Sequence, residues 1–117
     1  MRAVLYNPTT QITSEVNIDT EKGIEDYYKY LECSCFTVVE VEVLTNNGKP
    51  EWVSIYCDDN GLLSDNLVTS IQGYHEPLAG NLLFLGDVDE EGETLALPEN
   101  ISTMKIDSLL SFYGIVR

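Results

Sequence analysis

The chain has 117 residues, of which 44% are hydrophobic, and its 20 acidic residues outnumber its 6 lysines and arginines, for a formal net charge of −14. This length suits one domain, and so large an apolar fraction excludes a disordered tail. Because phosphates and anionic lipid headgroups repel an acidic chain, we expect no direct nucleic-acid or membrane binding, and a basic protein surface as the partner.

Targeting signals are absent from the sequence as read. No apolar run approaches the roughly 18 residues of a membrane-spanning helix, and the first residues lack a basic-then-apolar signal pattern. The three cysteines, an odd number, fit free thiols in a reducing compartment. We therefore expect an intracellular protein with a single domain over residues 1–117.

The first third of the chain predicts a hairpin followed by a helix. Residues 3–6 indicate one short strand, and residues 12–18 indicate a second, with apolar side chains on one face at period two. Asp19 and Thr20 are suited to cap a helix, which we expect from about residue 21 to residue 32. Its apolar face has the spacing i, i+3, i+4, i+7 and consists of Ile24, Tyr27, Tyr28 and Leu31.

A second hairpin is predicted from Phe36 to Cys57 at the centre of the sheet. Asn46 to Pro50 contain the Asn-Gly pair that most strongly indicates a tight hairpin turn. The period-two pattern on either side places one set of side chains on each face. One face holds Val39, Val41, Val43, Val53, Ile55 and Cys57, and the other holds Glu40, Glu42, Trp52, Ser54 and Tyr56.

The second half of the chain is less regular. Leu62 and Leu63 resume an apolar run briefly, residues 67–71 predict either a strand or a helical turn, and residues 73–80 a loop. A strand at 81–86, an acidic turn at 87–93 and an apolar segment at 94–97 follow, and then a final helix from Pro98 to about Gly114. The predicted fold class is α+β: a small, mainly antiparallel sheet with two helices packed on it.

Several segments together resemble a known family. They are the strand at 1–6, the helix at 21–31, and the segments 55–62 (Ile-Tyr-Cys-Asp-Asp-Asn-Gly-Leu), 78–86 (Leu-Ala-Gly-Asn-Leu-Leu-Phe-Leu-Gly) and 89–93 (Asp-Glu-Glu-Gly-Glu). This layout resembles a domain family of unknown function from phages, plasmids and gut bacteria. The resemblance implies a mobile-element accessory protein in the cytoplasm of a bacterial host, with no enzymatic activity to carry over.

Two groups of residues have some of the ligand atoms or spacing of a metal site. Asp87, Asp89, Glu91 and Gly92 are spaced like the start of a calcium loop, but Pro98 occupies the twelfth position and no helix leads into the loop. Cys33, Cys35, Cys57 and His75 contain zinc-ligand atoms, but the first pair is spaced too tightly and the other two are scattered. A solvated acidic turn and a buried Cys57 are therefore preferred, and no metal or other cofactor is predicted.

Catalytic patterns are also weak. His75 is the single histidine, and no serine or cysteine nearby has the context of an activated nucleophile. No glycine-rich phosphate loop occurs, because Gly80 to Gly86 enclose an apolar strand. We therefore predict that the protein is not an enzyme.

The leading functional hypothesis is an acidic protein–protein interaction module. Its carboxylates would meet a basic groove, and could stand in for phosphates in the nucleic-acid site of a host nuclease or defence factor. Tyr30, off the apolar helical stripe and beside carboxylates, adds an interface-like aromatic. The candidate partner-binding residues are Glu40, Glu42, Asp58, Asp59, Asp87, Asp89, Glu90, Glu91, Glu93 and Tyr30.

Two alternatives remain open at this point. One is a homo-oligomer that sequesters a nucleotide-like small ligand, although an anionic ligand needs basic groups. The chain has few of them, and they are spread along it: Arg2, Lys22, Lys29, Lys49, Lys105 and Arg117. The other alternative is a structural accessory domain without a partner of its own.

Overall fold

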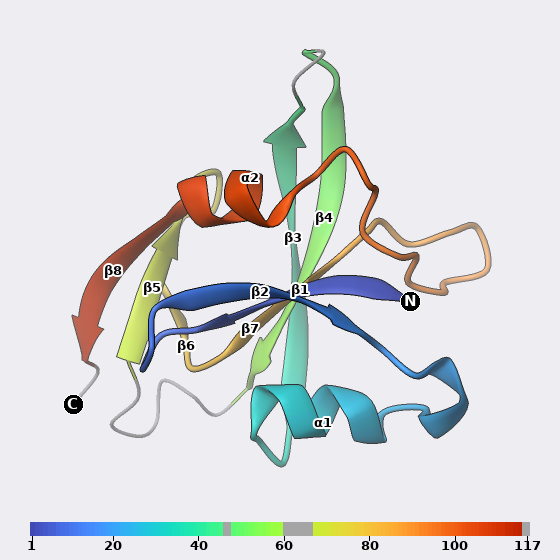
Figure 1. Cartoon of the computed structure of the whole chain (residues 1–117), viewed down its shortest axis with the longest axis horizontal. Helices are drawn as coiled ribbons and strands as arrows, with labels where there is room; N and C mark the ends of the chain where they lie inside the picture. The colour runs from blue at the N-terminus through green and yellow to red at the C-terminus, as the bar shows by residue number, and fades with distance from the viewer. Residues whose placement is uncertain (46–47, 60–66, 116–117) are drawn as a thin grey trace.

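The protein is described from a computed structural model that covers residues 1–45, 48–59 and 67–115 (Figure 1). Within these ranges the chain forms eight strands, two α-helices and one 3-10 turn, η1, at Thr20–Lys22. The helices are α1 (Glu25–Leu31) and α2 (Thr103–Ser108). The strands are β1 (Arg2–Asn7), β2 (Ile12–Asn17), β3 (Phe36–Leu44), β4 (Pro50–Asp58), β5 (Leu67–Ile71), β6 (Leu78–Ala79), β7 (Leu82–Leu85) and β8 (Leu110–Ile115).

The strands form two antiparallel sheets. The larger sheet has the order β2-β1-β7-β4-β3, and the smaller has the order β6-β5-β8. Strand β7 comes late in the chain but lies between β1 and β4, so that Phe84 is paired with Val4 on one side and Ile55 on the other. The two hairpins β1–β2 and β3–β4 are thereby joined through β7.

The centre of the larger sheet is covered on both faces. Because side chains alternate along a strand, Leu82 and Phe84 of β7 point to one face and Leu83 and Leu85 to the other, and all four are buried. The first face packs against β5, β6 and α2 in an inter-sheet core that includes Phe84, and the second packs against α1 in a helix-side core. This double burial explains the continuous apolar sequence of β7.

The predicted fold class, α+β with a small sheet and two packed helices, is wrong. The described residues are mostly antiparallel sheet, and α1 and α2 contain only 7 and 6 residues. The largest error is the final helix, predicted to run from Pro98 to about Gly114. It ends at Ser108, and β8 then pairs along β5 from Ile71↔Leu110 to Leu67↔Ile115. Residues 110–115 include Phe112, Tyr113 and Ile115, which are aromatic or β-branched and favour a strand, and pairing with the open edge of β5 outweighs the helical stripe.

The first helix is also shorter than predicted. Asp19 does act as a cap, since its Oδ1 accepts from the amide of Glu21 at 3.0 Å, but it caps η1 and not α1. Gly23, at φ +60°, separates η1 from α1. None of the described helices is long and apolar enough to cross a membrane.

The central hairpin is confirmed. Strands β3 and β4 pair without a register shift from Phe36↔Asp58 to Leu44↔Pro50, and the amide of Thr45 donates to the carbonyl of Lys49 at 3.0 Å. Val39, Val41 and Val43 of β3 and the Val53, Ile55 and Cys57 side chains of β4 join the inter-sheet core, as the period-two pattern predicts. The predicted turn residues 46–47 and the apolar pair 62–63 lie outside the described residues. Residues 67–71, predicted as strand or helical turn, form β5.

Candidate functional site

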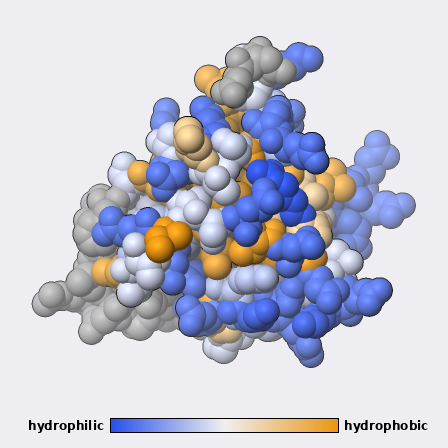
Figure 2. Space-filling model, in the orientation of Figure 1, coloured by the Kyte–Doolittle hydropathy of each residue, from blue (hydrophilic) through white to orange (hydrophobic). Residues whose placement is uncertain are grey.

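An open hollow of about 400 Å³ lies on the α1 side of the larger sheet. We call it the tyrosine hollow. It lies between α1, the sheet and the end of the acidic loop at residues 87–93. The visible surface over α1 and over this loop is mostly hydrophilic (Figure 2). The residues that line it are Met1, Ile18, Thr20, Gly23, Ile24, Tyr27, Phe36, Val38, Tyr56, Gly92, Glu93 and Thr94.

Three aromatic rings build the inner wall of the tyrosine hollow. The rings of Tyr27, on α1, and Tyr56, on β4, are stacked, with centroids 4.7 Å apart and planes inclined by 7°. Phe36, at the start of β3, is tilted against both, at 5.6 Å from Tyr27 and 5.5 Å from Tyr56. Since each ring is held by two others, the wall is pre-formed before any ligand arrives.

The hydroxyl groups of the two tyrosines give the hollow a polar end. The Tyr56 hydroxyl and Thr94 Oγ1 are hydrogen-bonded at 2.5 Å. Burial raises the pKa of Tyr27 from its usual 10.0 to about 12, with further contributions from Tyr56 and from the negative charge of Glu93. Tyr27 is thus a neutral hydroxyl beside a carboxylate.

The raised pKa predicts how Tyr27 affects stability at alkaline pH. Between pH 10, where the unfolded chain loses this proton, and about 12, where the folded chain does, stability falls as pH rises. Tyr27→Phe is therefore expected to lose less stability across this window than the wild-type chain. Urea unfolding at several pH values measures the difference; equal losses in the two proteins contradict the assignment. Cys57, whose pKa burial raises to about 11, titrates in both proteins and cancels.

A strip of exposed side chains continues from the tyrosine hollow along β3. Phe36 and Val38 line the hollow, so the period of two places Glu40, Glu42 and Leu44 on the same face. Trp52 lies opposite Glu42 on β4. Three large apolar side chains stay open here: Val38 is 40% exposed, Leu44 61% and Trp52 47%. We call Val38, Glu40, Glu42, Leu44 and Trp52 the β3 strip.

The structure brings together only some of the predicted acidic residues. Glu40 and Glu42 belong to the β3 strip, and Glu93 borders the tyrosine hollow. Asp58 and Asp59 lie at the far end of β4, beside Glu76 in a second hollow of about 190 Å³. The acidic candidates are therefore divided between separate surfaces.

Hydrogen bonds within the acidic loop fix its conformation. Asp89 Oδ1 accepts from the amides of Glu91 and Glu93, both at 2.9 Å, and Asp87 Oδ1 accepts from the amide of Val88 at 2.7 Å. These two carboxylates shape the turn. Glu90 and Glu91 are exposed at its tip.

The side chain of Tyr30 is not fully exposed to solvent. Its ring is half-buried and packs against the helix-side core, and Lys29 Nζ lies 5.2 Å from the ring centroid. Tyr30 is therefore mainly a packing residue on α1.

Metal ligands do not converge in the described part of the chain. No group of three His, Cys, Asp or Glu side chains there is placed to hold a metal ion. Of the zinc candidates, Cys33 packs in the helix-side core and Cys57 in the inter-sheet core, on opposite faces of the larger sheet.

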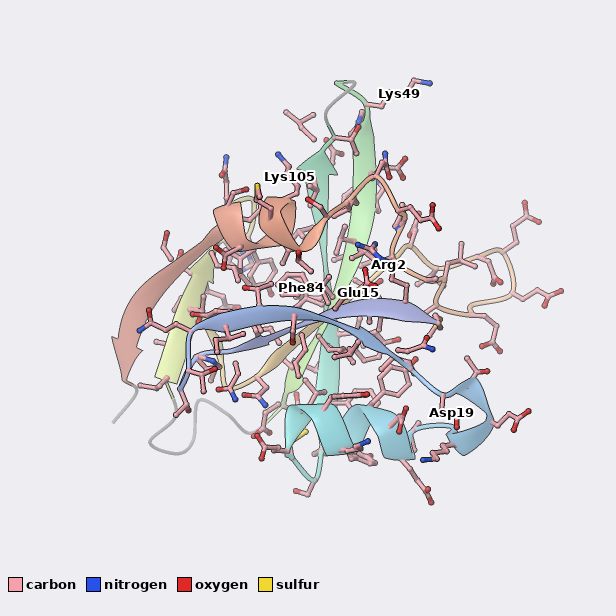
Figure 3. The ribbon with its side chains drawn as sticks, viewed as in Figure 1. Arg2, Glu15, Asp19, Lys49, Phe84 and Lys105 are labelled. Atoms are coloured by element: carbon pink, nitrogen blue, oxygen red, sulfur yellow. The ribbon has the colours of Figure 1, made fainter. Side chains whose placement is uncertain are left out.

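The described basic side chains are dispersed and do not line the tyrosine hollow. Lys49 lies at the end of the β3–β4 hairpin, Lys105 on α2, and Arg2 on β1 (Figure 3). Arg117 lies outside the described residues. The amino group of Met1, a residue that also borders the hollow, donates to Asn17 Oδ1 at 2.6 Å and to the carbonyl of Ile18 at 2.9 Å. The predicted alternative of an anionic small ligand finds no lysine or arginine in this hollow.

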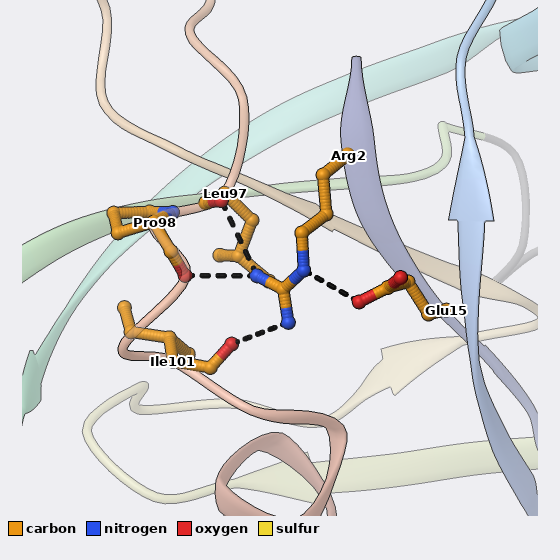
Figure 4. Close-up of polar contacts among 5 residues, drawn as sticks. All are labelled: Arg2, Glu15, Leu97, Pro98 and Ile101. Carbon is orange, nitrogen blue, oxygen red and sulfur yellow. Dashed lines mark hydrogen bonds and ion pairs between the residues drawn. The ribbon is translucent and has the colours of Figure 1, made fainter.

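Arg2 is committed to a structural role (Figure 4). Its Nε donates to Glu15 at 2.6 Å, Nη1 to the carbonyls of Leu97 and Pro98 at 3.2 and 2.8 Å, and Nη2 to the carbonyl of Ile101 at 2.9 Å. The guanidinium thus fastens the segment before α2 to β1.

Sequence reasoning missed the tyrosine hollow because its walls come from distant segments. Tyr27, Tyr56 and Thr94 belong to α1, β4 and the end of the acidic loop. A usable signal was the exposed face of the central hairpin, where Val38 and Trp52 are apolar at positions that the alternation assigns to solvent.

A protein-family model matches most of the chain. The family model described as "Domain of unknown function (DUF3846)" matches residues 1–109, from β1 to the end of α2 and short of β8. No curated protein and no solved structure matches significantly. The predicted resemblance to a domain family of unknown function is confirmed at that level, and this chain belongs to the DUF3846 family.

Proposed function

We propose that this chain is an acidic protein-interaction module that binds a basic segment of a partner protein along the β3 strip and the adjoining tyrosine hollow. The observation that carries the proposal is the composition of the strip, where Val38, Leu44 and Trp52 stay exposed on the face that also bears Glu40 and Glu42. Charges of one sign flanked by exposed apolar groups suit a partner that offers Lys or Arg flanked by apolar contacts.

Charge supports the same partner chemistry. With a net charge of −14, the chain attracts basic surfaces at long range, and this attraction speeds encounter and weakens with salt. The resemblance to mobile-element proteins suggests a host or phage protein as the partner. In the more specific version the partner is a nuclease or defence factor, and the carboxylates occupy its nucleic-acid site.

The test is a capture experiment with matched variants. The immobilised chain is exposed to bacterial host lysate at low and high salt, and retained proteins are identified by mass spectrometry. Glu40→Gln/Glu42→Gln is expected to weaken binding of the retained partner about tenfold, on the order of 1.4 kcal/mol. Glu76→Gln/Glu99→Gln removes the same charge at exposed positions away from the strip and is expected to bind like wild type.

The outcomes separate the versions of the proposal. A partner lost equally from both double variants, or retained without regard to salt, contradicts a docking face on β3. For the nucleic-acid-mimic version, duplex DNA added to the lysate is expected to displace this chain from the partner. Binding that DNA leaves unchanged contradicts that version alone.

A further inference from the structure

Resting on the proposed function, we infer that the tyrosine hollow receives the side chain of a single lysine or arginine from the partner's basic segment. The walls suit the stem of such a side chain. Ile24, Phe36 and Val38 are apolar, and the hollow is open to solvent on one side. Its volume of about 400 Å³ is near the lower end of the ~300–1,000 Å³ typical of ligand pockets, as a single side chain requires.

The polar end of the hollow suits the charged head. Tyr27, Tyr56 and Thr94 supply hydroxyl oxygens, which accept hydrogen bonds, and Glu93 supplies a carboxylate. Ammonium and guanidinium groups are donors without acceptors, so this end complements them. The aromatic rings add an electrostatic attraction for a cation placed near them.

Other occupants fit less well. An anion would meet Glu93 and no lysine or arginine in the lining, and the Met1 amino group at its border already donates to Asn17 and Ile18. A purely aliphatic side chain would displace water from the Tyr27 and Thr94 hydroxyls without replacing its hydrogen bonds. The Glu93 carboxylate, which borders the hollow beside the Tyr56 and Thr94 hydroxyls, places a negative charge at the end where the cationic head would lie.

The test uses small defined probes. Acetylated, amidated tripeptides Gly-Arg-Gly and Gly-Lys-Gly are titrated into the labelled protein and followed by NMR, with Gly-citrulline-Gly and Gly-norleucine-Gly as neutral counterparts of similar shape. The cationic peptides are expected to shift the resonances of Tyr27, Tyr56 and Val38, and to bind at least about tenfold more tightly than the neutral ones. Such a difference corresponds to about 1.4 kcal/mol.

Two variants in the same loop give a matched comparison. Glu93→Gln removes the carboxylate at the hollow and is expected to weaken binding of the cationic peptides about tenfold. Glu90→Gln removes an equal charge at the exposed loop tip and is expected to leave binding unchanged. Equal binding of charged and neutral peptides, equal effects of the two variants, or no binding overturns the inference.

The result is distinguishable from that of the capture experiment. Glu40→Gln/Glu42→Gln can weaken partner capture while Glu93→Gln leaves the affinity of the cationic peptides unchanged. In that case the docking face on β3 is supported, and the inference of a cationic side chain in the tyrosine hollow is overturned. Conversely, the cationic peptides can bind in the hollow while Glu40→Gln/Glu42→Gln leaves partner capture unchanged. In that case the cation site is supported and the proposed function fails.

Discussion

Replacing Phe84 by alanine is expected to lower the free energy of unfolding by about 3–5 kcal/mol. Phe84 is 1% exposed at the centre of β7, between Val4 of β1 and Ile55 of β4, and its ring enters the inter-sheet core (Figure 3). Its truncation removes apolar contacts on both sides and leaves a cavity that paired strands cannot close. Urea unfolding followed by circular dichroism measures the loss.

The control for this substitution is Met104→Ala. Met104 is 81% exposed on α2, so its truncation is expected to change stability by less than about 0.5 kcal/mol. Phe84→Leu fills most of the cavity and is expected to fall between the two. A loss below about 1 kcal/mol for Phe84→Ala would show that the strands around β7 are not packed as described.

Arg2→Met is expected to destabilise the protein by about 3 kcal/mol. The substitution keeps an apolar stem but leaves the carbonyls of Leu97, Pro98 and Ile101 without the donor that satisfies them. Charged donors make the stronger hydrogen bonds in proteins, and Leu97 and Ile101 must hold their place in the inter-sheet core. Thermal and urea unfolding measure the effect.

Two further variants identify which contacts of Arg2 matter. Glu15→Gln removes only the charge of a partner whose side chain is 59% exposed, so a loss below about 1 kcal/mol is expected. Arg2→Lys keeps the positive charge, but its compact ammonium group lacks the planar fork of donors with which the guanidinium reaches three carbonyls. This variant is expected to recover only part of the stability. If Glu15→Gln costs as much as Arg2→Met, the ion pair and not the carbonyl contacts holds this segment.

Local patterns were sufficient to predict the centre of the fold. In the β3–β4 hairpin, alternation, branched residues and an Asn-Gly turn all indicate the same structure, and the faces of Val41 and Val53 were assigned correctly. The strand at β7 was also predicted, although its place between β1 and β4 was not. Strand order depends on contacts between distant segments, which periodicity does not encode.

The C-terminal part shows where such patterns mislead. Ile101, Ile106 and Leu109 are buried as a helical stripe requires, yet the chain leaves the helix at Ser108. The register from Ile71↔Leu110 onward indicates that β5, with β6 on one side, offers a second edge that residues 110–115 complete. The β5–β8 pairing is a tertiary interaction, and its free energy outweighs the local preference for helix.

The candidate site was predicted in part for a similar reason. Charge and alternation identified Glu40 and Glu42, because the face on which a strand residue lies follows from the pattern of residues two positions away. The tyrosine hollow depends on α1 crossing Tyr56 and on the acidic loop returning to it at Thr94. Neither of these contacts between distant segments leaves a short-range signal in the sequence.

The position of β7 also governs how the molecule can be assembled on the ribosome. Hairpins β1–β2 and β3–β4 can each form early, but the edges of β1 and β4 that face one another stay open until residues 82–85 emerge. Open edges are templates for association with other chains, and such long-range closure slows folding. A nascent chain halted before β7 is therefore the form of this protein most exposed to aggregation and most dependent on chaperones.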